Sequence, residues 1–131
     1  MTFTLTQIFT ILFFHFLFDF VFQSDKQAKG KSSNWRDLLS HTFTYSICWT
    51  PVIVVLTNIH TQSLERPTYL LIGLQFSIIT FFWHTITDYI TSRENKKLWE
   101  VGRVHDFFVG IGHDQLWHYI QLFLTFQYVL Q

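Results

Sequence analysis

The sequence has little of what small secreted or nucleic-acid-binding domains rely on. Charged residues make up only 14% of its 131 residues, well below the roughly 25% of an average soluble domain. Its one cysteine, Cys48, cannot close an internal disulfide or form a Cys-rich metal site. Nine Lys and Arg balance nine Asp and Glu, so no basic field indicates a nucleic-acid partner. These absences exclude a disulfide-stapled secreted protein, a zinc finger and a nucleic-acid-binding domain.

Lysine and arginine are missing from four long apolar stretches. Each stretch is about 21 to 25 residues long, which is the length an α-helix needs to cross a hydrocarbon core of roughly 30 Å. The stretches cover residues 1–21, 38–59, 67–90 and 107–131. The pattern predicts an all-α polytopic membrane protein, a four-transmembrane-helix bundle in one domain over residues 1–131. The expected helices run approximately over 3–23, 38–59, 67–91 and 106–130.

The positive charges gather in two of the three connecting segments. Segments 24–37 and 91–106 carry four Lys or Arg residues each, whereas segment 60–66 has only Arg66, beside Glu65. The excess of Lys and Arg in cytoplasmic loops sets the orientation of most membrane proteins. We therefore expect 24–37 and 91–106 to lie in the cytoplasm and both termini to lie outside, in the inner (cell) membrane.

The ionisable side chains inside the expected helices follow a pattern. His15 and Asp19 are four residues apart, as are His84 and Asp88, and each spacing puts both side chains on one helix face. Asp114 and His118 repeat the spacing in reverse order. Together with His41, all of these residues lie one to three turns from the expected cytoplasmic ends. They are therefore expected to converge in the cytoplasmic half of the bundle.

A faint internal repeat accompanies this pattern. The runs "FFHFLFDFVF" and "FFWHTITDYI" share a Phe pair, an H-x-x-x-D motif and a following aromatic residue. Each run is followed by a basic segment and then by a helix that bears His. The bundle is therefore predicted to consist of two similar helical hairpins related by a pseudo-two-fold axis along the membrane normal.

Four runs of this sequence resemble the DUF3307 family of small bacterial and phage membrane proteins. The runs are "HFLFDFVFQSDKQAKGK", "LLSH", "WHTITDYITSR" and "HDQLWH". The landmarks of the family fall on His15, Asp19, Gln23, Lys29 or Lys31, His41, His84, Asp88, Asp114, Gln115 and His118. The resemblance covers nearly the whole chain and implies no assigned function. The His and Asp layout is also similar, in residue types alone, to membrane-bound metal-dependent hydrolases of the YdjM type.

Imidazole and carboxylate side chains are suitable ligands for a divalent metal. The metal candidates are His15, Asp19, His41, His84, Asp88, Asp114 and His118. Seven exceed the four ligands of one tetrahedral zinc, so either two ions bind or some of the seven orient the others. Zn²⁺ is expected first, with Mn²⁺ or Fe²⁺ as alternatives.

A bound metal would generate hydroxide beside the inner leaflet, and Asp88 or Asp114 would serve as general base. An anionic lipid head group would be held by basic residues of the cytoplasmic segments. These are Lys29, Lys31, Arg36, Arg93 and Lys97. The resulting hypothesis is a metal-dependent hydrolase acting on a lipid-like or phosphorylated membrane substrate.

Two other classes of function stay open on the sequence. In a non-enzymatic interaction protein, such as a phage-encoded modifier of a host membrane complex, the His and Asp residues would be hydrogen-bonding staples between helices. In a small ion or proton transporter they would form a pathway across the bilayer. The bilayer is the expected partner in every case, and a bundle of this size is compatible with a homo-oligomer.

Overall fold

The protein is all-helical throughout the residues that its computed structural model describes, 3–61 and 66–129. Helix α1 (Leu5–Phe16) continues into the short π-helix η1 (Leu17–Val21), and α2 (Asp25–Gly30) follows. The three long helices are α3 (Trp35–Thr61), α4 (Arg66–Glu100) and α5 (Val104–Val129). The predicted all-α class is confirmed for these residues. Residues 62–65 of the expected connection, and residue 130 of the last expected helix, lie outside the described residues.

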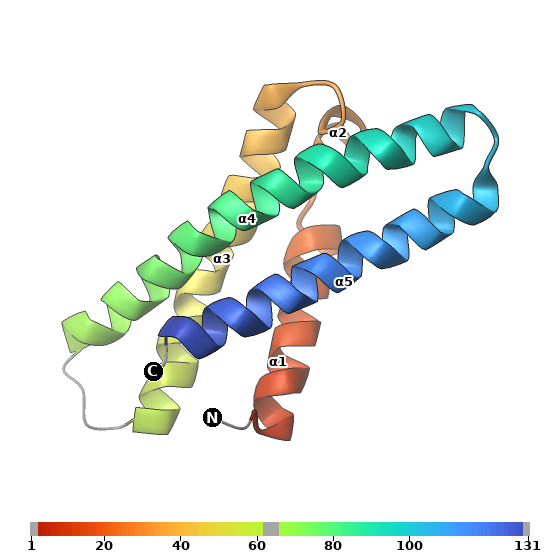
Figure 1. Ribbon diagram of the computed structural model, residues 1–131. Helices are drawn as coiled ribbons and strands as arrows, with labels where there is room; N and C mark the ends of the chain where they lie inside the picture. The colour runs from red at the N-terminus through yellow and green to blue at the C-terminus, as the bar shows by residue number, and fades with distance from the viewer. Residues whose placement is uncertain (1–2, 62–65, 130–131) are drawn as a thin grey trace.

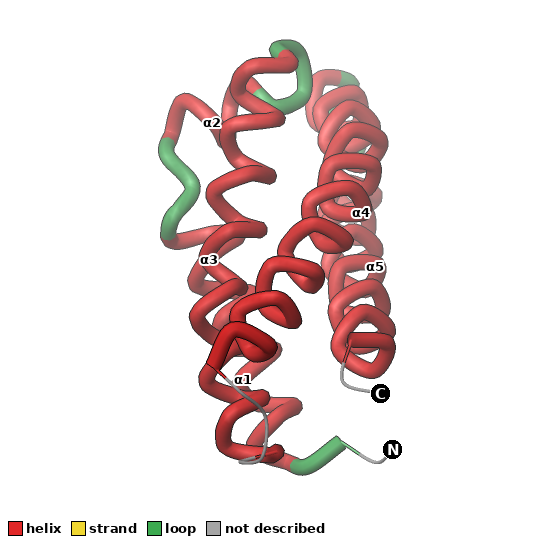
Figure 2. The backbone as a smooth tube through the Cα atoms, turned by 90° about the vertical axis from the view of Figure 1, so that its left-hand side faces the viewer, coloured by secondary structure: helices red, strands yellow, loops and turns green. Residues whose placement is uncertain are grey.

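The helices pack as a bundle (Figure 1). Helix α4 packs against both α3 and α5, while α1 contacts α5 and η1 contacts α3. The turned view shows α4 and α5 running alongside each other (Figure 2). Helix α2 and the α4–α5 turn lie at the end opposite the start of α1 and the end of α5 (Figure 1). We call this the basic end, because segments 24–37 and 91–106 meet there.

Helix α4 extends well beyond the expected boundary at residue 91. That boundary was placed where charged residues begin, but charge alone does not end a helix. The helix ends at Glu100, and Gly102, two residues further on, has a φ of 73°. The N–H groups of Gly102 and Arg103 donate to the carbonyls of Trp99 and Leu98, a pattern known as the Schellman motif. Most of the expected loop 91–106 is therefore helical.

Helix α2 lies inside the segment that was expected to be a loop. Ser24 caps its N-terminus by accepting a hydrogen bond from the Gln27 N–H, and the Gln27 side chain accepts one from the Ser24 N–H. This reciprocal arrangement is a capping box. Gly30 then lets the chain pass so close to Asp37 that a Cβ at position 30 would collide with that carboxylate. The two features hold the following residue, Lys31, in a fixed place.

Many polar residues are buried in the bundle, and many large apolar residues are exposed on its outside. The buried set includes His15, Asp19, His41, His84, Asp88 and His118, together with Thr42, Ser46, Thr57, Ser77, Thr80 and Thr125. The exposed set includes Phe9, Phe13, Phe16, Phe43, Ile78, Phe82, Phe108, Leu124 and Tyr128. Two helical segments, Trp35–Ile59 and Pro67–Glu100, are long and apolar enough to cross a membrane, and Leu5–Val21 is a shorter apolar segment.

Candidate metal centre

Asp19 reaches the interior of the bundle from an irregular turn. It lies within η1, where the Phe22 N–H donates to the Leu17 carbonyl, five residues back. Such single π-helical turns occur frequently at functional sites. The turn directs the Asp19 carboxylate at α3 and α4, where His41 and His84 lie, and also leaves it 3.8 Å from the His15 Nε2. The i,i+4 pairing with His15 is thus loose, and the main neighbours of Asp19 come from other helices.

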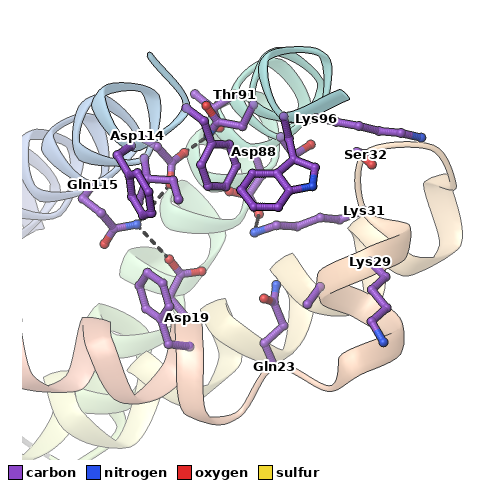
Figure 3. A pocket seen from close by; sticks show the side chains of 18 of the residues that line it. Asp19, Gln23, Lys29, Lys31, Ser32, Asp88, Thr91, Lys96, Asp114 and Gln115 are labelled. Atoms are coloured by element: carbon purple, nitrogen blue, oxygen red, sulfur yellow. Dashed lines mark hydrogen bonds and ion pairs between the residues drawn. The ribbon is translucent and has the colours of Figure 1, made fainter. Parts of the chain in front are cut away.

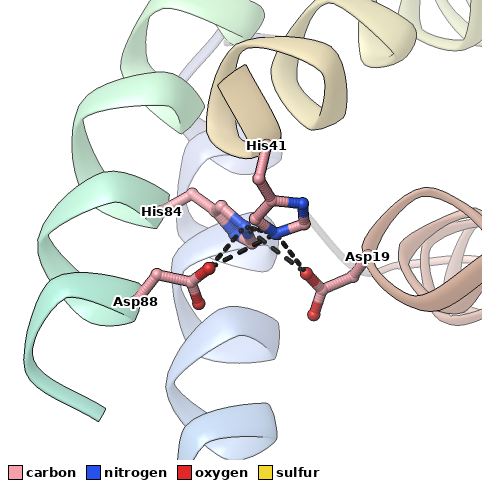
Figure 4. A group of neighbouring side chains, drawn as sticks. All are labelled: Asp19, His41, His84 and Asp88. Atoms are coloured by element: carbon pink, nitrogen blue, oxygen red, sulfur yellow. Dashed lines mark hydrogen bonds and ion pairs between the residues drawn. The ribbon is translucent and has the colours of Figure 1, made fainter. Parts of the chain in front are cut away.

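Four buried side chains from η1, α3 and α4 form the first cluster, the four-residue group Asp19, His41, His84 and Asp88 (Figure 4). The His41 Nε2 lies 3.0 Å from Asp19 Oδ1 and 3.3 Å from Asp88 Oδ2. The His84 Nε2 lies 3.5 Å and 3.6 Å from the same two oxygens. The two Nε2 atoms are 3.2 Å apart. Four atoms with lone pairs therefore face a common centre.

A second cluster, the three-residue group Asp19, Asp114 and His118, shares Asp19 with the first. His118 accepts no hydrogen bond at Nε2, although this atom is buried and lies 3.6 Å from Asp88 Oδ1. The opposite ring nitrogen, Nδ1, is 2.9 Å from the Asp114 carbonyl oxygen. Because a carbonyl only accepts, Nδ1 carries the proton and donates, which leaves the Nε2 lone pair free.

His15 belongs to neither group and instead hydrogen-bonds to side chains beside them. Its Nδ1 is 2.7 Å from the Tyr45 hydroxyl and its Nε2 is 2.8 Å from the Gln115 side-chain oxygen. The Gln115 amide donates in turn to Asp114 Oδ2 at 3.0 Å, and the Tyr45 ring stacks on the His84 ring with centroids 3.9 Å apart. Partners of this kind orient metal ligands and set their tautomers. Tyr45 was missed from the sequence because nothing distinguishes it from other apolar-face aromatics.

Lys31 brings a positive charge to the cluster from the basic end. Its Nζ lies 2.9 Å from Asp88 Oδ2, and its side chain is 18% exposed. Burial alone lowers the pKa of Lys31, but the charges of Asp88 and Asp19 outweigh it and hold the pKa above the usual value. Lys31 was predicted only as a head-group ligand. The capping box at the start of α2, just before Lys31, could have been recognised in the sequence from the S-x-x-Q pattern of Ser24 to Gln27.

A cavity of about 750 Å³ leads from the basic end to the cluster. Asp19, Asp88, Asp114 and Gln115 lie on its inner wall, where the Lys31 ammonium group reaches Asp88, and Lys29 and Lys96 line its outer part (Figure 3). Apolar side chains complete the wall, among them Phe20, Trp99, Phe107, Phe108 and Ile111. The cavity therefore combines carboxylates, ammonium groups and an apolar surface.

The cavity is lined by some of the predicted head-group residues and not by others. Lys29 and Lys31 line it, and Lys96, which was not predicted, does as well. Arg36 and Lys97 are not among its described lining residues. The Arg93 guanidinium instead lies 3.7 Å from the centre of the Tyr89 ring and 5.8 Å from that of Trp35, so it joins α4 to the start of α3.

The fold and the site define a helical protein with buried His and Asp side chains that could hold a metal ion. The family model described as "Protein of unknown function (DUF3307)" matches residues 8–131. The chain therefore belongs to the DUF3307 family, as its sequence motifs indicated. No curated protein and no solved structure matches the chain.

Proposed function

We propose that this protein is an integral membrane enzyme that binds a divalent metal at the four-residue group and hydrolyses a lipid-like, anionic substrate. The observation that carries the proposal is the arrangement of four donor atoms from Asp19, His41, His84 and Asp88 around one centre. The argument for the metal, for the membrane and for the reaction rests on different features of the molecule.

Three of the distances within the four-residue group match those of a tetrahedral metal site, and two are slightly shorter. Zinc binds imidazole nitrogen and carboxylate oxygen at about 2.0–2.2 Å. In a regular tetrahedron, bonds of that length place neighbouring ligand atoms about 3.3–3.6 Å apart. Five of the six separations within the group are known, and they range from 3.0 to 3.6 Å. Two His and two Asp ligands also suit Mn²⁺ or Fe²⁺.

The charge balance of the cluster also favours a cation. Asp19, Asp88 and Asp114 bring three carboxylates together, and Lys31 is the ammonium group that contacts them in the described residues. Unpaired charge is costly in a low-dielectric interior. A divalent ion supplies the charge that Lys31 alone does not, and it gives the free Nε2 lone pair of His118 a positive neighbour.

The distribution of side chains supports a lipid environment. Phe9, Phe13 and Phe16 on α1 and Phe108 and Leu124 on α5 are about half exposed or more, while His and Asp fill the interior. Water-soluble monomers rarely expose apolar surface so continuously. Segments Trp35–Ile59 and Pro67–Glu100 are long enough to span, and we infer that α1 with η1 and α5 complete a four-helix membrane bundle. The basic end then faces the cytoplasm.

The cavity matches an amphiphilic substrate with an anionic head. Lys29, Lys31 and Lys96 would hold the head group near Asp19 and Asp114, and Phe107 and Phe108 would contact the apolar chain. A divalent metal held beside the cavity would lower the pKa of a bound water and so supply hydroxide. In the hydrolysis a water oxygen bonds to the phosphorus or acyl carbon, the bond to the leaving oxygen breaks, and one water proton ends on the leaving oxygen.

A transport pathway is the less favoured reading of the same cluster. On the side away from the basic end, Ile11, Tyr45, Trp49, Phe76 and Leu122 pack together as a fully buried apolar core. An ion or proton route would need a continuous chain of polar groups through this region. The buried polar side chains beyond the cluster are mainly Thr and Ser, among them Thr57, Ser77 and Thr125, whereas the ionisable groups and the cavity lie toward the basic end. This arrangement suits a substrate that enters from the cytoplasmic leaflet.

Hydrolysis of a defined probe tests this function. Purified protein in vesicles would be loaded with Zn²⁺ or Mn²⁺ and given a fluorogenic phosphate monoester with a long alkyl chain, and separately a fluorogenic acyl ester. Loss of a group that merely orients a ligand costs about 10–100-fold, so we expect Asp88→Asn to lose more than about 100-fold. Asp106→Asn, which changes a half-buried Asp paired with Arg103, is the matched control. Metal-independent hydrolysis, or equal rates in both variants, would contradict the proposal.

A further inference from the structure

We propose that a second divalent cation binds at the three-residue group Asp19, Asp114 and His118, and that this is the ion that holds and activates a phosphate-ester substrate. The inference rests on the proposed function, since it adds a second ion to the metal centre inferred there. Each of the three residues offers a ligand atom within 4.8 Å of the other two.

The first support is His118, whose ring is fixed with a free lone pair. Its Nδ1 donates to the Asp114 carbonyl, and its Nε2 is buried without a hydrogen-bond partner. His118 is 1% exposed, so water does not satisfy this atom from outside. An imidazole whose far nitrogen is anchored to a carbonyl is the usual arrangement of a metal ligand, and the carboxylate oxygen nearest to this Nε2 is Asp88 Oδ1, at 3.6 Å.

The second support is the way Asp19 divides its two oxygens. Oδ1 faces His41 and His84 at 3.0 and 3.5 Å, in the four-residue group. Oδ2 faces the other way, 3.8 Å from the His15 Nε2 and 3.5 Å from the Gln115 amide nitrogen. A carboxylate in this position can bind one ion with each oxygen. Paired ions in phosphatases and nucleases lie about 3.5–4 Å apart, a distance that one bridging carboxylate can span.

The two sites differ in whether the protein leaves a coordination position open for water or substrate. The four-residue group already provides the four protein ligands of a filled tetrahedral site, and two of them, Asp19 and Asp88, line the cavity. The three-residue group provides three ligands, and Asp19 and Asp114 lie on the cavity wall. Catalytic sites keep such an open position for water or substrate. The second ion is therefore the one that substrate reaches, and Asp114 acts as its ligand.

The lysines around the cavity select the substrate class. Lys29, Lys31 and Lys96 line the approach to Asp114, and ammonium groups together with paired cations favour phosphate over a neutral acyl ester. The reaction is hydrolysis of a phosphate ester: the water oxygen bonds to phosphorus, the bond from phosphorus to the alcohol oxygen breaks, and that oxygen takes the proton. The products are phosphate and the alcohol of the amphiphile.

Metal stoichiometry distinguishes the second ion from the first. Full-length protein in detergent, reloaded with Mn²⁺ and freed of excess metal, should hold two equivalents and give the spectrum of exchange-coupled ions in electron paramagnetic resonance. Asp114→Asn and His118→Gln, each close in size to the native residue, should hold one uncoupled equivalent. Single occupancy of the wild type, or two equivalents in both variants, would overturn the second site. No metal in the wild type would overturn the first site as well.

Phosphate binding tests whether the second ion is the open one. Inorganic phosphate added to the Mn²⁺ protein should show strong paramagnetic broadening of its phosphorus resonance. The broadening should fall at least about tenfold in Asp114→Asn, while the Mn²⁺ retained at the four-residue group serves as an internal control. Unchanged broadening in Asp114→Asn would contradict the assignment, whatever the stoichiometry.

Discussion

The Nε2 atoms of His41 and His84 lie 3.2 Å apart, and both point to the same oxygens of Asp19 and Asp88. One hydrogen bond between the rings uses one proton and satisfies one lone pair. Asp19 Oδ1 also has His41 Nε2 as a hydrogen-bond partner at 3.0 Å, and Asp88 Oδ2 accepts from the Lys31 ammonium group at 2.9 Å. The proposed cation at the common centre would bind all four atoms together, and several predictions about stability and binding depend on it.

Metal removal should destabilise the folded protein. An ion that binds only the folded state stabilises it by about 2.7 kcal/mol when free metal exceeds the dissociation constant 100-fold. Adding a chelator should therefore lower the thermal unfolding temperature, and restoring Zn²⁺ should recover it, as measured by circular dichroism in detergent. A cluster held only by hydrogen bonds would unfold at the same temperature with and without chelator.

Lys31→Met should lower the free energy of unfolding of the metal-free protein far more than that of the metal-bound protein. Removing one partner of a buried ion pair costs about 3–5 kcal/mol, because the other charge is left uncompensated. In the metal-bound protein the ion supplies that charge, so the loss should shrink. Denaturant titrations with and without metal measure both values. Lys26→Met is the control, since its side chain is 82% exposed and such surface pairs contribute about 0–1 kcal/mol. An equal loss for Lys31→Met with and without metal would argue against a shared site.

The Lys31–Asp88 pair should contribute equally to stability across the neutral pH range. The folded-state pKa of Lys31 is raised above 10.5, so the contribution is complete below the unfolded value and is lost only as pH rises through the folded value. Any change in the effect of Lys31→Met between pH 6 and 9, measured by the same titrations, would show that another group controls the pair.

Gly30→Ala should detach Lys31 from the cluster. A Cβ at position 30 would collide with the Asp37 carboxylate, and overpacking of this kind costs about 1–3 kcal/mol. Gly112→Ala is the matched control: a Cβ there meets nothing within 4 Å, and Ala is favoured over Gly in a helix by up to about 1 kcal/mol. We expect Gly30→Ala to lower the unfolding temperature and Gly112→Ala to leave it unchanged or raise it. The opposite order would show that α2 does not need this close approach.

Thiol labelling tests the proposed membrane orientation. In a Cys48→Ser background, a membrane-impermeant maleimide applied to intact cells should label Tyr128→Cys, whose side chain is 66% exposed in the native protein. It should label Ser33→Cys, at the basic end, only after lysis. Recovery of the protein in the soluble fraction, or labelling of Ser33→Cys in intact cells, would contradict the orientation.

The convergence of the polar residues could be predicted because helix geometry alone determines it. His84 and Asp88 share a face at any helix position, and similar depths, about one turn for Asp19 and His41 and about two for Asp114, placed residues of different helices in the same half of the bundle. The roles within the cluster could not be predicted in this way. The π-helical turn at Leu17–Val21 directs Asp19 away from a simple pairing with His15. Lys31 and Tyr45 enter through tertiary packing, which single-helix periodicity does not contain.

The predicted helix boundaries were wrong for a related reason. Hydropathy marks where an apolar surface ends, whereas a helix ends where the backbone is capped or broken. Helix α4 continues through Arg93 and Lys97 as far as Glu100 because those residues favour helix, and Gly102 then ends it. Residues of the basic segments consequently line the cavity, and Lys96 is one of them. Arg93 instead stacks on the Tyr89 ring.

Metal content is the most direct test of the central claim. Full-length protein, purified in detergent and reloaded, would be compared by mass spectrometry with His84→Ala/Asp88→Ala and with the control His105→Ala/Asp106→Ala, which alters an exposed His and a half-buried Asp on α5. The account predicts metal in the wild type and the control, at least one equivalent of Zn, Mn or Fe for the four-residue group and two if the second site is also filled, and loss of at least the ion at the four-residue group in the His84/Asp88 variant. A well-folded wild type without metal after reloading would contradict it and favour a hydrogen-bonded staple in an interaction protein.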